Sequence, residues 1–222
     1  MKPARKVVRR NPSRGVGMVF GVGPDGAYAE HESFLERAFI LVASVCPHVR
    51  HIRSQPCRIE WADQTGQMHT YVPDFELELI DGCRLVVEVK PQRFVPKHKD
   101  QFDAVAKRLS GGALSYFVAT DRLLQAERVR QAELCRRFRK ADLPASLCQA
   151  ALELAKNGID FDAAARTNVP AYVWLGLIGR RMLHTSSADM SGSTRLVLEG
   201  DEHDSEVQCF DWFGGSRWGA NF

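Results

Sequence analysis

Residues 71–91 have the sequence YVPDFELELIDGCRLVVEVKP, and this stretch decides the fold that we expect. In its first half, apolar and acidic side chains alternate, which is the pattern of a β-strand with one buried face. Asp81 and Gly82 are a strong signal for a hairpin turn, and residues 84–90 then form a second, mostly apolar strand. Pro91 ends the pairing of that strand, because proline has no amide hydrogen to donate. The stretch therefore predicts two adjacent antiparallel strands.

Helical and extended patterns on both sides of this hairpin predict an α/β unit with a mixed sheet flanked by helices. In chain order the further elements are a helix from residue 33 to before residue 47, an extended segment at 58–61, a helix at 97–109, a buried strand at 114–119 and a basic helix at 122–140.

Changes in composition predict four parts of the chain. They are a basic arm at residues 1–28, the α/β unit at 29–142, a small domain at 143–198 and an acidic, aromatic tail at 199–222. We expect the arm to become ordered only against a partner. The small domain has three helical stretches and two short extended ones, which is the layout of a winged helix, although a small helical bundle would show the same periodicity.

The composition excludes several classes of protein. The chain has 222 residues, of which 45% are hydrophobic and 26% charged, so wholesale disorder is excluded. The longest largely apolar run, residues 38–46, is too short for a membrane span, and we identify no export signal. Six cysteines without a CxxC pair argue against a zinc ribbon or a disulfide scaffold. We therefore expect a cytoplasmic protein with reduced thiols.

Basic residues gather in two blocks, although the net charge is only +3. One block is the arm and the other is the helix at 122–140. Separate basic blocks on a nearly neutral chain favour a polyanionic partner, nucleic acid first, while a solvated arm and a solvated helix face explain the two blocks equally well. The candidate DNA-binding residues of the helix are Arg128, Arg130, Arg136, Arg137, Arg139 and Lys140.

The candidate catalytic group consists of Asp74, Glu88 and Lys90. Glu88 and Lys90 are two residues apart on one strand and therefore share a face, and the adjacent strand can bring Asp74 beside them. Two carboxylates can hold Mg²⁺, for which Mn²⁺ can substitute, and the lysine can position a water or stabilise charge on a phosphate. An exposed strand face with alternating charge is the simpler interpretation. It is less favoured because strongly apolar strand sequence surrounds these charges.

The PD–x13–ExK arrangement resembles the PD-(D/E)xK nuclease superfamily, and so implies a restriction-endonuclease-like fold. The segments HESFLERAFI, SQP, YVPDF, VVEVKP and YFVATD, in this order, also resemble the TnsA family. These proteins are the endonuclease subunits of heteromeric, Tn7-like cut-and-paste transposases. The resemblance covers roughly residues 30–125. It is weaker in the C-terminal third, where the family carries a winged-helix-like domain.

The resemblance assigns roles to single residues. It implies that Asp74 and Glu88 are metal ligands, that Lys90 is the catalytic lysine and that Glu36 is the helix glutamate that completes the metal site. Gln55 matches a recurrent Gln-Pro pair, which we expect to pack near the DNA strand that is cut. For Glu36 a second role stays open, because Ser33 and Glu36 also have the spacing of a helix capping box.

The resemblance also implies partners. In that family the subunit cuts the 5′ ends of the transposon, a TnsB-like DDE transposase cuts and joins the 3′ ends, and a TnsC-like AAA+ regulator couples cutting to target choice. The basic arm and helix would then follow phosphates of double-stranded DNA in a complex on the nucleoid. Two alternatives stay open: a stand-alone restriction or repair nuclease, and a non-catalytic DNA-binding assembly factor.

Three further patterns have competing interpretations. Cys46, His48 and His51 could bind a transition metal, but a loop between a helix and a strand is the favoured interpretation. The aromatic residues of 172–177 are expected in a core rather than in a base-stacking surface. The tail sequence FDWFGGSRWGANF is either a docking peptide for a partner or a segment that folds back on the domain.

Overall fold

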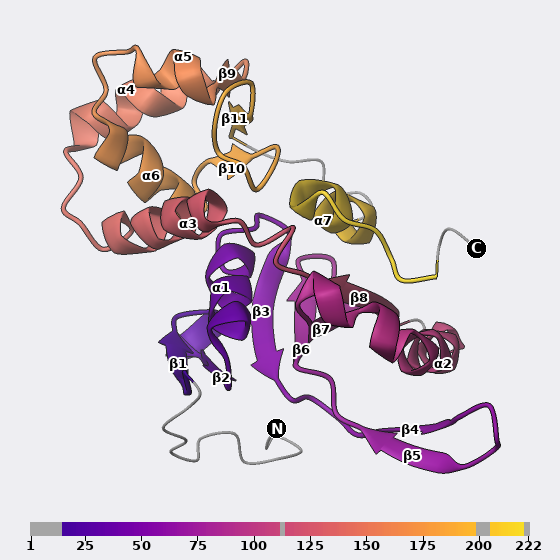
Figure 1. Ribbon diagram of the computed structural model, residues 1–222. Coiled ribbons are helices and arrows are strands. Elements are labelled where there is room, and N and C mark those ends of the chain that lie inside the picture. The colour runs from indigo at the N-terminus through magenta and orange to yellow at the C-terminus, as the bar shows by residue number, and fades with distance from the viewer. Residues whose placement is uncertain (1–14, 112–113, 199–204, 220–222) are drawn as a thin grey trace.

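The computed structural model describes residues 15–111, 114–198 and 205–219, and its centre is a four-stranded mixed sheet (Figure 1). In spatial order the strands are β3 (Val49–Ser54), β6 (Phe75–Leu79), β7 (Arg84–Val89) and β8 (Ser115–Ala119). Neighbouring strands are antiparallel except β7 and β8, which are parallel. The predicted mixed α/β class is therefore confirmed.

The turn between β6 and β7 forms where the sequence places it. Gly82 has a φ of 88°, which favours glycine, and the Asp81 carboxylate accepts a hydrogen bond of 2.9 Å from the backbone amide of Cys83. The resulting register pairs Phe75 with Val87. Asp74 directly precedes Phe75, and its carboxylate accepts a hydrogen bond from the backbone amide of Val89, the residue after Glu88.

Side chains of the two sheet faces enter different clusters. The face that carries Leu77 and Val87 packs with helix α1 (Phe34–Ala43) in the larger core. The face that carries Val86 and Tyr116 packs with helix α2 (Lys99–Ser110) and with a hairpin of β4 (Ile59–Ala62) and β5 (Met68–Tyr71). Two 3-10 turns, Gln92–Phe94 and Pro96–His98, connect β7 to α2.

The single strand predicted over the first half of residues 71–91 is wrong in one respect. The chain forms β5 up to Tyr71 and starts β6 at Phe75, and each pairs with different strands. Pro73 lies between them and cannot donate to a ladder, so the pairing changes there. As a result the β4–β5 hairpin extends away from the body of the molecule (Figure 1).

The predicted arm is also wrong from residue 15 onward, and residues 1–14 lie outside the described part of the chain. β1 (Gly17–Phe20) pairs with β2 (Tyr28–His31), and Val19 and Val22 are buried in the larger core. The backbone amide of Ile52 donates to the carbonyl of Val22 at 3.1 Å. Burial of these valines stabilises the packing of residues 15–28 against the larger core, and this packing involves no partner.

The C-terminal half contains the helices that the sequence predicts. They are α3 (Ala126–Phe138), α4 (Ala145–Ala155), α5 (Phe161–Ala165) and α6 (Ala171–Gly179). A small antiparallel sheet follows the order β10 (His184–Thr185), β11 (Arg195–Val197), β9 (Ile159–Asp160). Within the described residues no helix is long and apolar enough to cross a membrane.

Helix α3 lies between the α/β unit and the C-terminal helices, because it packs on α1 on one side and on α6 on the other (Figure 1). A Cβ atom at Gly179 would lie 2.2 Å from the Cys135 carbonyl oxygen, so α3 and α6 can approach this closely only with glycine there. Trp174 and Leu177 of α6 are buried in the core, which confirms the interpretation given to this stretch.

The described part of the tail folds back onto the α/β unit. Helix α7 (Ser205–Phe213) buries Phe210, Trp212 and Phe213, and the Phe213 ring lies 5.9 Å from Phe39 and 5.7 Å from Phe117 between centroids. The backbone amide of Trp218 donates to the Tyr116 carbonyl at 2.8 Å. The aromatic residues that a docking peptide would offer to a partner are thus part of the protein's own core.

Candidate active site

Asp74 occupies the break between β5 and β6, and backbone hydrogen bonds hold it from both sides. Its carboxylate accepts a bond of 2.8 Å from the amide of Val89, and its carbonyl accepts one of 2.8 Å from the amide of Gln55. Gln55 is buried and has a φ of 45°, an uncommon value for a residue other than glycine. The predicted Gln-Pro pair therefore supports the backbone of Asp74.

Glu88 and Lys90 lie at the end of β7 on the face predicted for them. The Lys90 ammonium donates to Glu88 Oε1 at 2.7 Å. The hydroxyl of Tyr71 donates to the other oxygen, Oε2, at 2.5 Å, and lies 2.9 Å from the hydroxyl of Tyr116. The Glu88 side chain is 5% exposed and that of Lys90 is 26% exposed, so the ion pair has a buried carboxylate and a partly exposed lysine.

Glu36 lies in the first turn of α1 and fills the predicted capping role in a modified form. The amide of Glu36 donates to Ser33 Oγ at 3.1 Å, as in a capping box. The Glu36 carboxylate accepts bonds from the Ser33 hydroxyl at 2.8 Å and from the amide of Glu32 at 2.6 Å. The amide that it reaches is therefore that of Glu32, one residue before the predicted Ser33.

The charges of these residues act on one another. Burial, followed by the negative charges of Glu88 and Glu36, raises the pKa of Asp74 well above its ordinary value. Burial alone would lower the pKa of Lys90, but the neighbouring carboxylates, Glu88 first, outweigh it and raise the pKa. Three carboxylates thus share one lysine, and this surplus of negative charge is suited to a cation.

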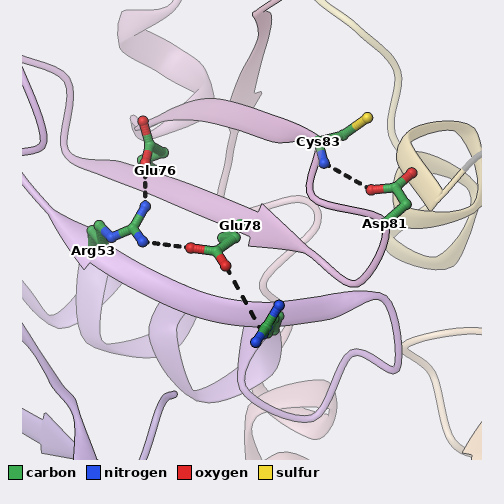
Figure 2. A network of polar contacts seen from close by, with 6 residues as sticks. Arg53, Glu76, Glu78, Asp81 and Cys83 are labelled. Carbon is green, nitrogen blue, oxygen red and sulfur yellow. Dashed lines mark hydrogen bonds and ion pairs between the residues drawn. The ribbon is translucent and has the colours of Figure 1, made fainter. Parts of the chain in front are cut away.

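Asp74 differs in its hydrogen-bond partners from Glu76 and Glu78, the next two acids along the chain, whose contacts Figure 2 shows. Glu76 and Glu78 both bond to the guanidinium of Arg53, with 2.7 Å from Arg53 Nη1 to Glu76 Oε1. Arg84 also lies 3.7 Å from Glu76. Arginine therefore neutralises these two acids, whereas the hydrogen bond to Asp74 comes from a backbone amide.

The donor chemistry of the site fits Mg²⁺, because carboxylate oxygens are its preferred protein ligands. Among the described residues, however, no three His, Cys, Asp or Glu side chains are grouped closely enough to hold a metal ion. Hydrogen bonds hold Glu36 in the helix cap and Glu88 between Lys90 and Tyr71. Cys46, His48 and His51, all within the described residues, are likewise not grouped closely enough to hold a metal ion.

A cleft of about 530 Å³ opens beside this cluster, between the start of α1 and the end of β7. Its lining includes Phe34, Glu36, Lys90, Phe94, Lys97 and His98. Phe34 is 77% exposed and Phe94 is 42% exposed. Sequence reasoning missed these two aromatic residues and the basic pair at 97–98. The signal that could have found Phe94 and the basic pair is the RFVPKHK run at residues 93–99, shortly after Pro91.

The six candidate DNA-binding residues of α3 and its C-terminal end divide into two sets. Arg128, Arg136 and Arg139 are held by the protein itself. Arg128 bonds to Asp189 at 2.6 Å and to the Phe213 carbonyl at 2.9 Å. Arg136 and Arg139 donate to the carbonyls of residues 20 and 21, at 2.5 Å and 2.9 Å. These three arginines fasten α3 to its neighbours.

The other set faces solvent. Arg137 and Lys140 are exposed, and the Arg137 guanidinium lies 5.9 Å from the centroid of the Phe138 ring. Arg130 is exposed and pairs with Glu127 at 2.6 Å. A phosphate could compete for an exposed guanidinium of this kind, since surface ion pairs contribute little stability. Arg130, Arg137 and Lys140 thus remain candidates for DNA contacts.

A mixed sheet with a carboxylate–lysine cluster at its strand ends, beside a cleft that both acidic and basic side chains line, fits a nuclease-like α/β fold. Residues 46–128 match the family model described as TnsA-like endonuclease N terminal. This segment is similar to the N-terminal domain of TnsA-like endonucleases, which confirms the family resemblance predicted from the sequence. Gln55, Asp74, Glu88 and Lys90 lie inside the matched segment, and Glu36 lies before it. A comparison of the chain with curated proteins gives no match.

Proposed function

We propose that this protein is a Mg²⁺-dependent DNA endonuclease that cuts the 5′ ends of a transposon during cut-and-paste transposition. One observation carries the proposal. Asp74, Glu88 and Lys90 come together at one point of a TnsA-like domain, through the Val89 amide and the Lys90–Glu88 ion pair.

Each residue has a role that its surroundings support. Asp74 and Glu88 would hold Mg²⁺ through their carboxylates, and Glu36 would join them from the first turn of α1. When bound, Mg²⁺ would offset charge on the phosphate and lower the pKa of a coordinated water. The Lys90 side chain lines the cleft and is 26% exposed, so its ammonium group can orient the attacking water or stabilise the charge that develops on the phosphate.

The cleft supports DNA as the substrate. Lys97 and His98 lie on its wall beside Lys90, where they can contact phosphate oxygens. Phe34 and Phe94 offer exposed rings on which a base could stack. The exposed residues Arg130, Arg137 and Lys140 would follow the duplex farther from the cut.

We further propose that the segment at 143–198 is a winged-helix-like domain, because three helices accompany a three-stranded sheet there. The proposed partners are a TnsB-like DDE transposase and a TnsC-like AAA+ regulator, and the proposed location is the cytoplasm, on the nucleoid during assembly. These parts of the proposal rest on the family resemblance.

The test is a strand-resolved cleavage assay on a labelled transposon-end duplex with the full chain, with and without a DDE transposase from the same element. We expect Mg²⁺-dependent cuts at the 5′ ends, and their loss in Asp74→Ala and Lys90→Ala variants that keep their melting temperature. Cutting by Asp74→Ala at the wild-type rate would contradict the proposed site. Cutting of unrelated DNA without the transposase would favour a stand-alone nuclease, and DNA binding without any cutting would favour an assembly factor.

A further inference from the structure

Two buried tyrosines contact the candidate active site from outside the PD–x13–ExK motif. Tyr71, the last residue of β5, is 7% exposed, and Tyr116 on β8 is 1% exposed. Their hydroxyls lie 2.9 Å apart, and that of Tyr71 bonds to Glu88 Oε2 at 2.5 Å. The three residues come from three different strands, so only the folded chain brings them together.

The direction of these hydrogen bonds follows from the number of protons. A tyrosine hydroxyl has one hydrogen, and Tyr71 gives its hydrogen to Glu88. Tyr116 must therefore be the donor in the bond between the two hydroxyls. The result is a directed chain, from Tyr116 to Tyr71 and from Tyr71 to Glu88.

This series of hydrogen bonds fixes the orientation of the Glu88 carboxylate. Lys90 bonds to one oxygen at 2.7 Å and Tyr71 bonds to the other at 2.5 Å. Because each carboxylate oxygen has two lone pairs, both oxygens keep acceptor capacity after these bonds. Rotation of the carboxylate would break both bonds in a position that is 4% exposed, where water cannot easily replace them.

We infer that Tyr71 is a positioning residue for the proposed Mg²⁺ site: it holds Glu88 in the orientation in which this carboxylate can bind the ion. This inference rests on the proposed function. Tyr116 supports it from behind by orienting the Tyr71 hydroxyl. Tyr71 also ends the extended β4–β5 hairpin, so the hydrogen bond attaches the base of that hairpin to the active site.

An ordinary core role is the competing explanation, because buried tyrosines usually find some hydrogen-bond partner. The two explanations differ in what removal of one hydroxyl changes. A packing role predicts a change in stability alone. A positioning role predicts a weaker affinity for Mg²⁺, since partners that orient metal ligands are commonly worth a factor of about 10 to 100 in affinity or activity.

The experiment compares the full-length wild type with Tyr71→Phe, which keeps the ring and removes the hydroxyl. The readouts are the Mg²⁺ affinity from calorimetric titration, the Mg²⁺ concentration for half-maximal cleavage, and DNA affinity in EDTA. We expect both Mg²⁺ values to rise by about 10-fold or more while DNA affinity stays unchanged. Tyr172→Phe, on α6, is the matched control and should change none of them.

Two further variants keep the inference testable if Tyr71→Phe folds poorly or is ambiguous. Tyr116→Phe leaves the Tyr71–Glu88 bond in place and should give a smaller shift in the same direction. In a Glu88→Gln background, the Tyr71 substitution should cause no further loss of Mg²⁺ affinity, because its effect passes through the Glu88 carboxylate.

The outcomes separate this inference from the proposed function. If the wild type binds no Mg²⁺, the proposed function fails and this inference fails with it. If the wild type binds Mg²⁺ and Tyr71→Phe binds it equally well, only the inference is overturned. An equal loss of affinity in the wild-type and Glu88→Gln backgrounds would also overturn it.

Discussion

Replacing Glu36 with glutamine separates its capping role from its proposed metal role. The Glu36 carboxylate accepts hydrogen bonds from the Glu32 amide at 2.6 Å and from the Ser33 hydroxyl at 2.8 Å. Glutamine can keep both contacts, because its carbonyl accepts from the Glu32 amide and its NH₂ group can donate to Ser33 Oγ. Only the charge and one acceptor are lost.

The expected effect on stability is therefore small. Hydrogen bonds to a charged acceptor are worth about 1 kcal/mol more than neutral ones, so loss of the charge costs on that order. Removal of a negative charge near Asp74 offsets part of this cost. A change of about 1 kcal/mol shifts the Tm of a protein of this size by about 2–4 °C. Cleavage should fall by several orders of magnitude if Glu36 is a ligand.

Ser33→Ala is the matched control and should behave in the opposite way. It removes the N-cap acceptor of the Glu36 amide, at about 1 kcal/mol, while the Glu36 carboxylate keeps its bond to Glu32. Activity should be largely retained. Tm would be measured by calorimetry in EDTA, and cleavage on labelled duplex across a Mg²⁺ series. Full activity in Glu36→Gln would refute the metal role and leave Asp74 and Glu88 as the only protein ligands.

Three other variants test the electrostatics and the packing. Asp74→Asn should raise the Tm of the metal-free protein at pH 7, because a raised pKa makes ionisation of Asp74 unfavourable in the folded state. This gain should shrink as the pH falls toward about 3.9, the ordinary aspartate value, and a gain independent of pH in calorimetry would contradict the reasoning. Arg137→Ala should flatten the salt dependence of duplex binding, measured by anisotropy, by about one unit without lowering Tm. Arg136→Ala should lower Tm and leave the slope unchanged, since its guanidinium bonds to Ser44 Oγ and to the Phe20 carbonyl, and the opposite pattern would show that Arg136 contacts DNA. Phe213→Ala should cost about 3–5 kcal/mol in denaturant unfolding, whereas Val207→Ala on the same helix, at a side chain 50% exposed, should cost little, and equal losses would argue against the aromatic core.

Sequence reasoning succeeded where the information was local. The alternation of side chains and the Asp81–Gly82 turn fix the register of β6 and β7, which pairs Phe75 with Val87 and so brings the neighbouring Asp74 to the end of β7. Lys90 follows Glu88 two residues later on the same face. The core of the candidate site could therefore be predicted without knowledge of any distant contact.

Sequence reasoning failed where distant segments decide the environment of a side chain. Arg136 and Arg137 are adjacent and chemically identical, yet one bonds to the carbonyl of Phe20 and the other faces solvent. The contact of Tyr71 with Glu88 could not be predicted from the sequence. Glu88 belongs to a different strand pair, and Pro73 interrupts the alternating pattern between the two residues. The tail was ambiguous for the same reason, since its aromatic residues meet Phe39 and Phe117 from far along the chain.

The position of α7 sets an order of events during synthesis. The sheet is complete once Ala119 has been made, but its cover over Phe117 comes from Phe210 and Phe213, which the ribosome adds much later. Domains generally fold as units while the chain emerges. Here the α/β unit must wait, with this part of its core open, until residues 120–204 have been made and α7 can fold back. A chain cut short before α7 would lack part of that core, so the proposed nuclease would gain its full stability only after its C-terminal half has been translated.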